Sequence, residues 1–122
     1  MIQSISAITL ATHEMRHAVG FYQTLGFEVT YGGAEDAFTS FRVSTSYLNL
    51  IIQPFDRQWS WWGRVIFQVT DVDALYRLAV TKGLKPDTYP RDAEWGERYF
   101  HITDPDGHEL SFARPLPADQ MA

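Results

Sequence analysis

The stretch ISAITLATHEMRHAVGFYQTLGFEV, residues 5–29, is followed 57 positions later by a second version of itself, WGRVIFQVTDVDALYRLAVTKGLKP, residues 62–86. Placing Gly26 on Gly83 also aligns apolar residues with apolar residues: Ile8 with Val65, Leu10 with Phe67, Met15 with Val72, Phe21 with Leu78, and Phe27 with Leu84. Self-similarity at a fixed offset indicates one supersecondary unit used twice. The fold is therefore expected to contain two modules of the same architecture.

Each copy predicts a strand, a helix and then further strands. The strands at 6–12 and 64–70 alternate apolar and polar residues, and helical spacing follows near 14–25 and 72–82 until a glycine ends each helix. Three more strands are expected in each copy, at 27–33, 38–44 and 46–54 in the first and at 86–90, 98–103 and 108–115 in the second. The pattern predicts an α+β fold of two β-α-β-β-β modules.

Composition narrows the function classes. The chain has 122 residues, of which 45% are apolar, and we expect one domain: module one at about 4–56, an aromatic linker at 57–63, module two at about 64–116 and a tail at 117–122. A net charge of −5 without a basic run argues against a nucleic-acid or membrane partner. The absence of cysteine, signal peptide and long apolar run favours a cytoplasmic protein with a small-molecule partner.

His13-Glu14-Met15-Arg16-His17 matches the H-E-x-x-H pattern of zinc hydrolases. That chemistry requires both imidazoles on one helix face. At the offset of 57, however, His13 and Glu14 align with Thr70 and Asp71, where the second helix begins. We therefore expect His13 to be at or before the helix cap and the motif to be chemically silent.

Two further segments, FYQTLGFEV at 21–29 and WGERYFHITDPDGHELSFARP at 95–115, resemble the vicinal oxygen chelate superfamily, which includes glyoxalase I, bleomycin resistance proteins and extradiol dioxygenases. The resemblance covers residues 4–116 and implies an eight-stranded, incompletely closed, mainly antiparallel sheet with helices outside. It also implies a ligand cavity and a homodimer. The Asp104–Gly107 turn belongs to the scaffold.

Members of that family that use a metal typically present His or Glu on the first strand of each module and a carboxylate on the last. The resemblance carries these four positions onto Ala7, Arg64, Asn49 and Ser111. A methyl group, a guanidinium, an amide and a hydroxyl do not supply the ligands that Zn²⁺, Ni²⁺ or Fe²⁺ prefers. We therefore expect no metal and no cofactor.

Strand alternation and the family's ligand positions together predict what lines the cavity. The ligand-binding residues are expected to be Tyr47, Asn49, Trp62, Arg64, Tyr99 and Ser111, and His101 and Glu109 are the candidates for acid–base catalysis. Two simpler explanations stay open. Arg64 and Glu109 form a salt bridge that only fills the former metal site, or His101 is merely hydrogen-bonded across the strands.

The linker FDRQWSWWGR, 55–64, contains three tryptophans, and Trp95 adds a fourth. They either pack in a core or dimer interface, or provide a stacking wall for a flat ligand. Three functions follow. The preferred one is metal-independent binding of a small planar or anionic molecule. The alternatives are an enzyme of the same fold (lyase, isomerase or dioxygenase-like) that uses His101 and Glu109 as acid and base or as unconventional metal ligands, and a non-catalytic assembly module.

Overall fold

The computed structural model describes residues 1–117, so only Pro117 of the predicted tail is inside the described part of the chain. The chain divides into two compact units, Met1–Ser60 (unit one) and Trp61–Ala122 (unit two). The boundary falls inside the predicted linker. No helix among the described residues is long and apolar enough to cross a membrane.

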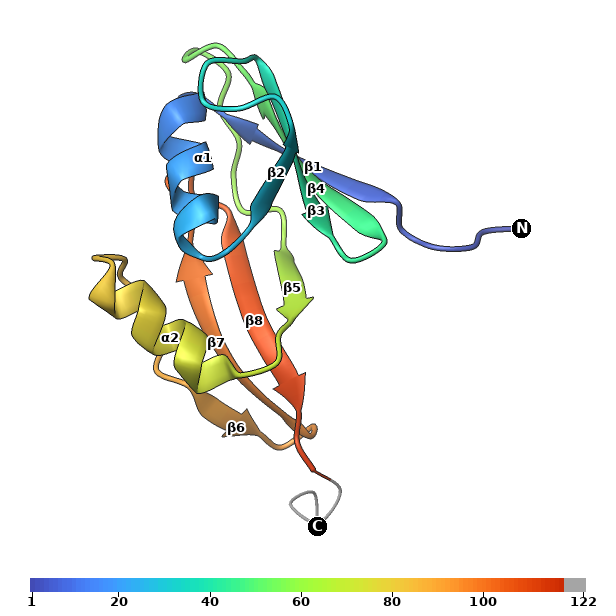
Figure 1. The fold of residues 1–122 in the computed structure, drawn as a ribbon, viewed down its shortest axis with the longest axis vertical. Coiled ribbons are helices and arrows are strands. Elements are labelled where there is room, and N and C mark those ends of the chain that lie inside the picture. Colours follow the sequence, from blue (N-terminus) through green and yellow to red (C-terminus); the bar gives the residue numbers. More distant parts are fainter. Residues whose placement is uncertain (118–122) are drawn as a thin grey trace. The chain divides into compact units, whose positions relative to one another are not determined.

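Unit one contains one helix and a four-stranded sheet (Figure 1). Its elements are β1 (Ala7–Thr12), α1 (Met15–Thr24), β2 (Glu28–Tyr31), β3 (Phe38–Val43) and β4 (Ser46–Ile52). The strand order is β1-β4-β3-β2, in which β1 and β4 are parallel and the other pairs are antiparallel.

Unit two repeats this topology (Figure 1). Its elements are β5 (Arg64–Gln68), α2 (Val72–Thr81), β6 (Arg91–Ala93), β7 (Glu97–Thr103) and β8 (Glu109–Pro115). The order β5-β8-β7-β6 again has a parallel first pair and antiparallel neighbours. The α+β fold of two β-α-β-β-β modules is thus confirmed, and its eight strands in residues 1–117 form two open four-stranded sheets.

The helix bounds confirm the offset of 57, because Met15–Thr24 corresponds to Val72–Thr81. The strand registers relate the last strands of the two units at an offset of 62. Ala7 is opposite Tyr47 in unit one, and Arg64 is opposite Glu109 in unit two. Two residues further along both strands, Thr9 is opposite Asn49, and Ile66 is opposite Ser111. Ala7 and Arg64 are therefore equivalent positions, and so are Asn49 and Ser111.

An aromatic cluster fills the core of unit one. Tyr22 of α1 is fully buried, and its ring is 5.2 Å from Phe21, 5.3 Å from Phe27 and 5.6 Å from Phe41 between centroids. The helix ends at a glycine as predicted, because Gly26 has φ +95°, a conformation that L side chains disfavour.

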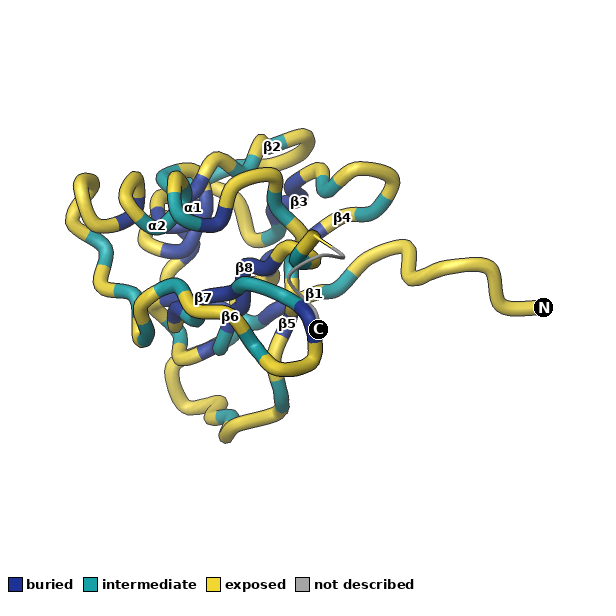
Figure 2. Tube along the Cα trace, turned by 90° about the horizontal axis from the view of Figure 1, so that it is seen from below, coloured by how far each residue is buried: buried dark blue, intermediate teal, exposed yellow. Residues whose placement is uncertain are grey.

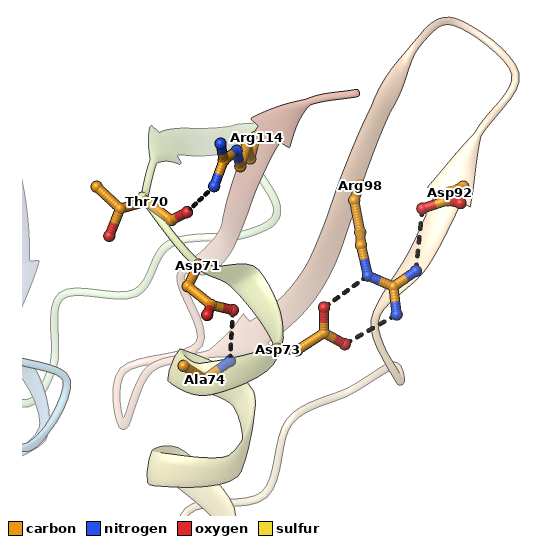
Figure 3. A network of polar contacts seen from close by, with 7 residues as sticks. All are labelled: Thr70, Asp71, Asp73, Ala74, Asp92, Arg98 and Arg114. Atoms are coloured by element: carbon orange, nitrogen blue, oxygen red, sulfur yellow. Dashed lines mark hydrogen bonds and ion pairs between the residues drawn. The ribbon is translucent and has the colours of Figure 1, made fainter. Parts of the chain in front are cut away.

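Unit two adds polar contacts to its apolar core. The buried residues of β7 and β8 form the centre of the unit (Figure 2). Arg98 of β7 donates two hydrogen bonds of 2.8 Å to Asp73 of α2 and one of 2.9 Å to Asp92 of β6 (Figure 3). The hydrogen bond from Arg98 lowers the pKa of Asp73, so the carboxylate stays charged. This network joins the helix to two strands.

The strand expected at 86–90 is wrong in its position, because the observed strand β6 comes directly after it, at Arg91–Ala93. Pro86 and Pro90 lack the N–H group that a ladder needs. Segment 86–90 is nevertheless held beside β7 by two hydrogen bonds. Asp87 N–H donates to the His101 carbonyl, and His101 N–H donates to Thr88 Oγ1.

Candidate functional site

Except for Trp62, the predicted site residues of unit two share the face of its sheet that points away from α2. Register places Arg64 beside Glu109, and Ser111 between Ile66 and His101. The opposite face packs toward α2 with buried apolar side chains: Val65, Phe100, Ile102, Leu110 and Phe112. We define the open face of unit two, the face without a helix, as Arg64, Ile66, Tyr99, His101, Glu109 and Ser111. Tyr99 and Ser111 are buried, and the other four are at least partly exposed.

Arg64 and Glu109 form an ion pair on this face. Arg64 Nη2 is 2.7 Å from Glu109 Oε1, and about a third of each side chain is exposed (35% and 31%). Both charges are therefore paired with each other and still accessible to solvent. A pair with this exposure contributes little net stability, because water competes for both groups.

His101 has an unsatisfied ring nitrogen. Its Nδ1 is buried, and it makes no hydrogen bond within the described part of the chain. Burial lowers the pKa of His101, and the positive charges of Arg64 and Arg91 lower it further. The imidazole is thus neutral near pH 7, with one nitrogen as donor and the other as acceptor.

Tyr99 is held by Arg91, which sequence reasoning missed, and by Trp95, one of the four tryptophans noted in the sequence. Arg91 Nε donates to the Tyr99 hydroxyl at 2.9 Å, and the guanidinium carbon is 5.3 Å from the ring centroid. Trp95 stacks on the same ring at 5.8 Å. Arg91 is in the strand whose position was mispredicted, and a correct placement of β6 would have put it opposite Tyr99.

Trp62 is bound to the turn before β8 instead of projecting freely. Its Nε1 donates to His108 Nδ1 at 2.7 Å, and the Trp62 residue remains 45% exposed. His108 itself is buried, and its N–H donates to Asp104 Oδ1 at 2.9 Å. The indole is therefore oriented while part of it is open to solvent.

Tyr47 and Asn49 belong to unit one, where they line the equivalent face of its sheet. Asn49 Nδ2 donates to Thr9 Oγ1 at 3.3 Å, and the guanidinium carbon of Arg42 is 5.6 Å from the Tyr47 ring centroid. Both residues line an open depression of about 490 Å³. The predicted residues thus fall into two groups, one on each unit.

The positions that the family resemblance assigns to metal ligands do not fit a divalent cation. They are occupied by Ala7, Asn49, Arg64 and Ser111, which offer neither an imidazole nor a carboxylate. The nearest carboxylate in register is Glu109, and it is engaged with Arg64. Within residues 1–117, no three His, Asp or Glu side chains gather closely enough to hold a metal ion.

The H-E-x-x-H motif has the geometry expected of a helix start. Glu14 is the N-cap of α1, so His13 precedes the helix. The His13 ring stacks on Trp59 at 4.5 Å and on Phe55 at 5.2 Å, whereas His17 pairs with Glu14. The two imidazoles have different partners, and the prediction that His13 lies outside the helix is confirmed.

The sequence matches a known family, and the fold is similar to those of solved structures. The sequence model of the Glyoxalase/Bleomycin resistance protein/Dioxygenase superfamily matches residues 4–112. The bleomycin resistance determinant encoded on transposon Tn5 superposes with a TM-score of 0.75 at 18% identity, covering 93% of this chain and 98% of that one. Lactoylglutathione lyase from Agrobacterium tumefaciens has a TM-score of 0.75 at 17% identity, covering 93% and 95%.

A curated relative matches over a shorter range. An uncharacterised protein of Mycobacterium bovis is 42% identical over 48 residues, which are 39% of this chain and 32% of that protein. The match thus spans about a third of that relative's length. At identities below 25% the two solved structures establish a shared fold, and the same fold accommodates a resistance determinant and a lyase.

Proposed function

This chain belongs to the Glyoxalase/Bleomycin resistance protein/Dioxygenase superfamily, and we propose that it binds a small planar or anionic molecule without a metal ion. The binding residues are those of the open face of unit two, with Arg64 at their centre. Tyr47 and Asn49 on unit one are proposed as further ligand contacts. The observation that carries the proposal is the accessible Arg64–Glu109 pair beside the unsatisfied Nδ1 of His101.

Arg64 supplies the positive charge at a position where relatives that use metal place a ligand. A guanidinium has five N–H donors and can bind a carboxylate or phosphate through two parallel hydrogen bonds. Only one contact to Glu109 is made, from Nη2 to Oε1. The remaining donors leave room for an anion, which would compete with Glu109 for the same cation.

His101 adds a directional contact. A neutral imidazole can accept a hydrogen bond from a ligand hydroxyl or N–H at one nitrogen, or donate to a ligand oxygen. Satisfying the buried Nδ1 would remove the cost of leaving a polar atom without a partner, about 1–3 kcal/mol. These residues therefore favour a ligand that has both an anionic group and a hydrogen-bonding atom.

The same residues support a second candidate, an enzyme that uses His101 and Glu109 as acid and base. The observation in its favour is the lowered pKa of His101, since a neutral imidazole near pH 7 can accept a proton. Glu109 Oε1 lies 2.7 Å from Arg64 Nη2 on the same face. Turnover of a bound carbonyl compound, lost in His101→Gln with binding retained, would favour this candidate over simple binding.

The proposals of a homodimer and of a cytoplasmic location have separate support. The homodimer is supported by the family resemblance, and the cytoplasmic location is supported by the absence of cysteine from the sequence. Sedimentation at micromolar concentration tests the first. A monomer at all concentrations would rule it out.

The decisive test is tryptophan-fluorescence titration of wild-type protein with a panel of carboxylates, phosphates and bleomycin. Arg64→Gln should weaken the best anionic binder about ten- to a hundredfold, which corresponds to a charge-assisted hydrogen bond of about 1.5–3 kcal/mol. Glu109→Gln should strengthen the binding of that anion, because the substitution removes the competing carboxylate. Arg16→Gln is the matched control, since Arg16 pairs with Glu35 elsewhere on unit one.

Unchanged affinity in Arg64→Gln would contradict the proposed site. The metal-independent part is tested by elemental analysis of protein purified without chelators and by melting curves with and without EDTA. We expect a stoichiometric metal content near zero and the same melting temperature in both.

A further inference from the structure

We propose that the open face of unit two binds a flat molecule with two negative groups, one held by Arg64 and the other by Arg91 of β6. This inference rests on the proposed function, which assigns one anionic group to Arg64 and a hydrogen-bonding atom to His101. It adds Arg91 as a residue that determines specificity, and it narrows the ligand to an aromatic dicarboxylate.

Register places the Arg91 side chain on the open face. Arg91 is directly opposite Tyr99 in the antiparallel pair of β6 and β7, and the side chains of directly opposite residues emerge on the same side of a sheet. Asp92, the next residue, emerges on the other side, where it accepts a hydrogen bond from Arg98 at 2.9 Å. Arg91 therefore shares the face of Tyr99 and His101, and the adjacent carboxylate is engaged on the opposite face.

The contact with Tyr99 fixes the direction of the Arg91 guanidinium. Arg91 is exposed, and its Nε donates to the Tyr99 hydroxyl at 2.9 Å. Within residues 1–117, its terminal nitrogens Nη1 and Nη2 make no hydrogen bond or ion pair. Two parallel N–H groups of this kind are what a guanidinium offers to a carboxylate. Arg91 is thus oriented by one hydrogen bond and can still hold an anion with its other donors.

Arg91 differs from Arg64 in having no competing carboxylate. Arg64 is paired with Glu109 at 2.7 Å, whereas no carboxylate in the described part of the chain forms an ion pair with Arg91. A ligand anion therefore reaches Arg91 without breaking an ion pair, and has to displace Glu109 only at Arg64. The two arginines are complementary to two anionic groups that bind under different conditions.

His101 lies midway between the levels of the two arginines. Arg64 is level with Thr103 of β7 in the strand registers. Arg91 is level with Tyr99, so His101 is two residues from each level. At a rise of about 3.3 Å per residue and a spacing of about 4.8 Å between strands, the Cα atoms of the two arginines are about 20 Å apart.

The two guanidiniums also act on the same imidazole. Burial lowers the pKa of His101, and the positive charges of Arg64 and Arg91 lower it further. Long side chains that stand off the sheet and lean along it bring their charged ends closer together than their Cα atoms. A rigid dianion of two fused rings therefore matches the gap, with His101 Nδ1 available to a polar atom between its ends.

Aromatic rings line the Arg91 end of this face. Trp95 stacks on Tyr99 at 5.8 Å with 26° between the ring planes, and the Tyr99 ring is 4.9 Å from that of His101. Trp95 is 66% exposed, and its Nε1 donates to Glu97 Oε1 at 2.9 Å, which orients the indole. An oriented and exposed ring beside a guanidinium favours a flat ligand with a negative edge.

The test uses calorimetric titration with 2,6-naphthalenedicarboxylate and its monomethyl ester, which keeps the rings and removes one charge. Wild type should bind the dicarboxylate at least about tenfold more tightly than the ester, a difference of about 1.4 kcal/mol. Arg91→Gln should abolish this preference, and Arg91→Lys should restore part of it because the charge returns without the planar fork. Arg77→Gln, at an exposed position on α2, is the matched control and should leave both affinities unchanged.

A measurement on wild-type protein keeps the test independent of whether Arg91→Gln folds. In NMR spectra of wild type, the dicarboxylate should shift the guanidinium Nε–H signals of both Arg64 and Arg91 and leave that of Arg77 in place. A shift of the Arg64 signal alone would contradict the second contact.

Equal affinity of wild type for the dicarboxylate and the ester would overturn the inference, and so would a preference that survives in Arg91→Gln. If Arg64→Gln still weakens the best anion of the panel in either case, the proposed function stands without the second anionic group. Failure of both naphthalene probes to bind would also overturn the inference, while the panel continues to test Arg64 separately.

Discussion

The two units have the same strand order, but they hold their helices by different means. Helix α1 buries five side chains against its sheet: Met15, Ala18, Val19, Phe21 and Tyr22. Helix α2 buries two, Val72 and Ala79. Tyr22 and Ala79 are equivalent at the offset of 57, and both are fully buried. A large ring in unit one thus corresponds to a methyl group in unit two.

Unit two compensates with polar contacts. Asp71 caps α2 by accepting a hydrogen bond from the N–H of Ala74 at 3.0 Å, whereas the equivalent Glu14 makes no side-chain cap bond to α1. Arg98 ties α2 to two strands (Figure 3). The comparison teaches that one topology can be maintained by core volume in one copy and by a hydrogen-bond network in the other.

The largest expected effect tests the core of unit one. Tyr22→Ala removes a ring that contacts three other aromatic residues, so the free energy of unfolding should fall by about 3–5 kcal/mol. Urea unfolding followed by circular dichroism measures it. Tyr89→Ala, at a position 79% exposed, is the control and should change stability by less than about 0.5 kcal/mol. Equal losses would mean that the aromatic core is not what holds α1.

The next effect tests the network of unit two. Arg98→Ala should lower the free energy of unfolding by about 1–2 kcal/mol, because a bidentate pair and a second partner are lost from half-exposed positions. Arg98→Lys should recover only part of this, since an ammonium cannot reproduce the planar fork. Arg16→Ala, which removes an exposed pair in unit one, should cost less. A larger loss of unfolding free energy in Arg16→Ala than in Arg98→Ala would contradict the stronger role assigned to the Arg98 network.

The contribution of the Arg98–Asp73 pair should also depend on pH. The pKa of Asp73 is lowered in the folded state, so above the unfolded value of 3.8 the pair contributes fully. As pH falls below 3.8 and through the folded pKa, the unfolded state binds more protons than the native state and the contribution is lost. The difference in the free energy of unfolding between wild type and Arg98→Ala should therefore be the same at pH 7 and pH 5. It should shrink as the pH falls below about 3.8.

The smallest effect compares the two helix starts. Asp71→Ala should cost about 1 kcal/mol, the usual loss for a side-chain N-cap. Glu14→Ala should change the free energy of unfolding by less than about 0.5 kcal/mol, because Glu14 makes no cap bond. Both are measured by the same urea titration. If Glu14→Ala proves the more costly, α1 depends on its N-terminus more than the structure indicates.

Much of the fold follows from local sequence. The helices, their terminal glycines and most strands depend on residues within a turn or two of each other, so periodicity and the offset of 57 predict them correctly. The strand expected at 86–90 does not form there, because Pro86 and Pro90 cannot donate to a β-ladder. Of the candidate site, the sequence analysis offered an Arg64–Glu109 salt bridge as one explanation, and the two side chains do form an ion pair.

By itself, the sequence determined the doubled module and the position of His13 just before the first helix. Only the tertiary structure decided that Trp62 bonds to His108, 46 residues away, and that Arg98 reaches Asp73, 25 residues away. It also decided that Tyr31 joins the face of Arg42, because a one-residue bulge changes the side of the sheet on which a side chain emerges. Contacts of this kind depend on register between distant segments, which no local pattern encodes.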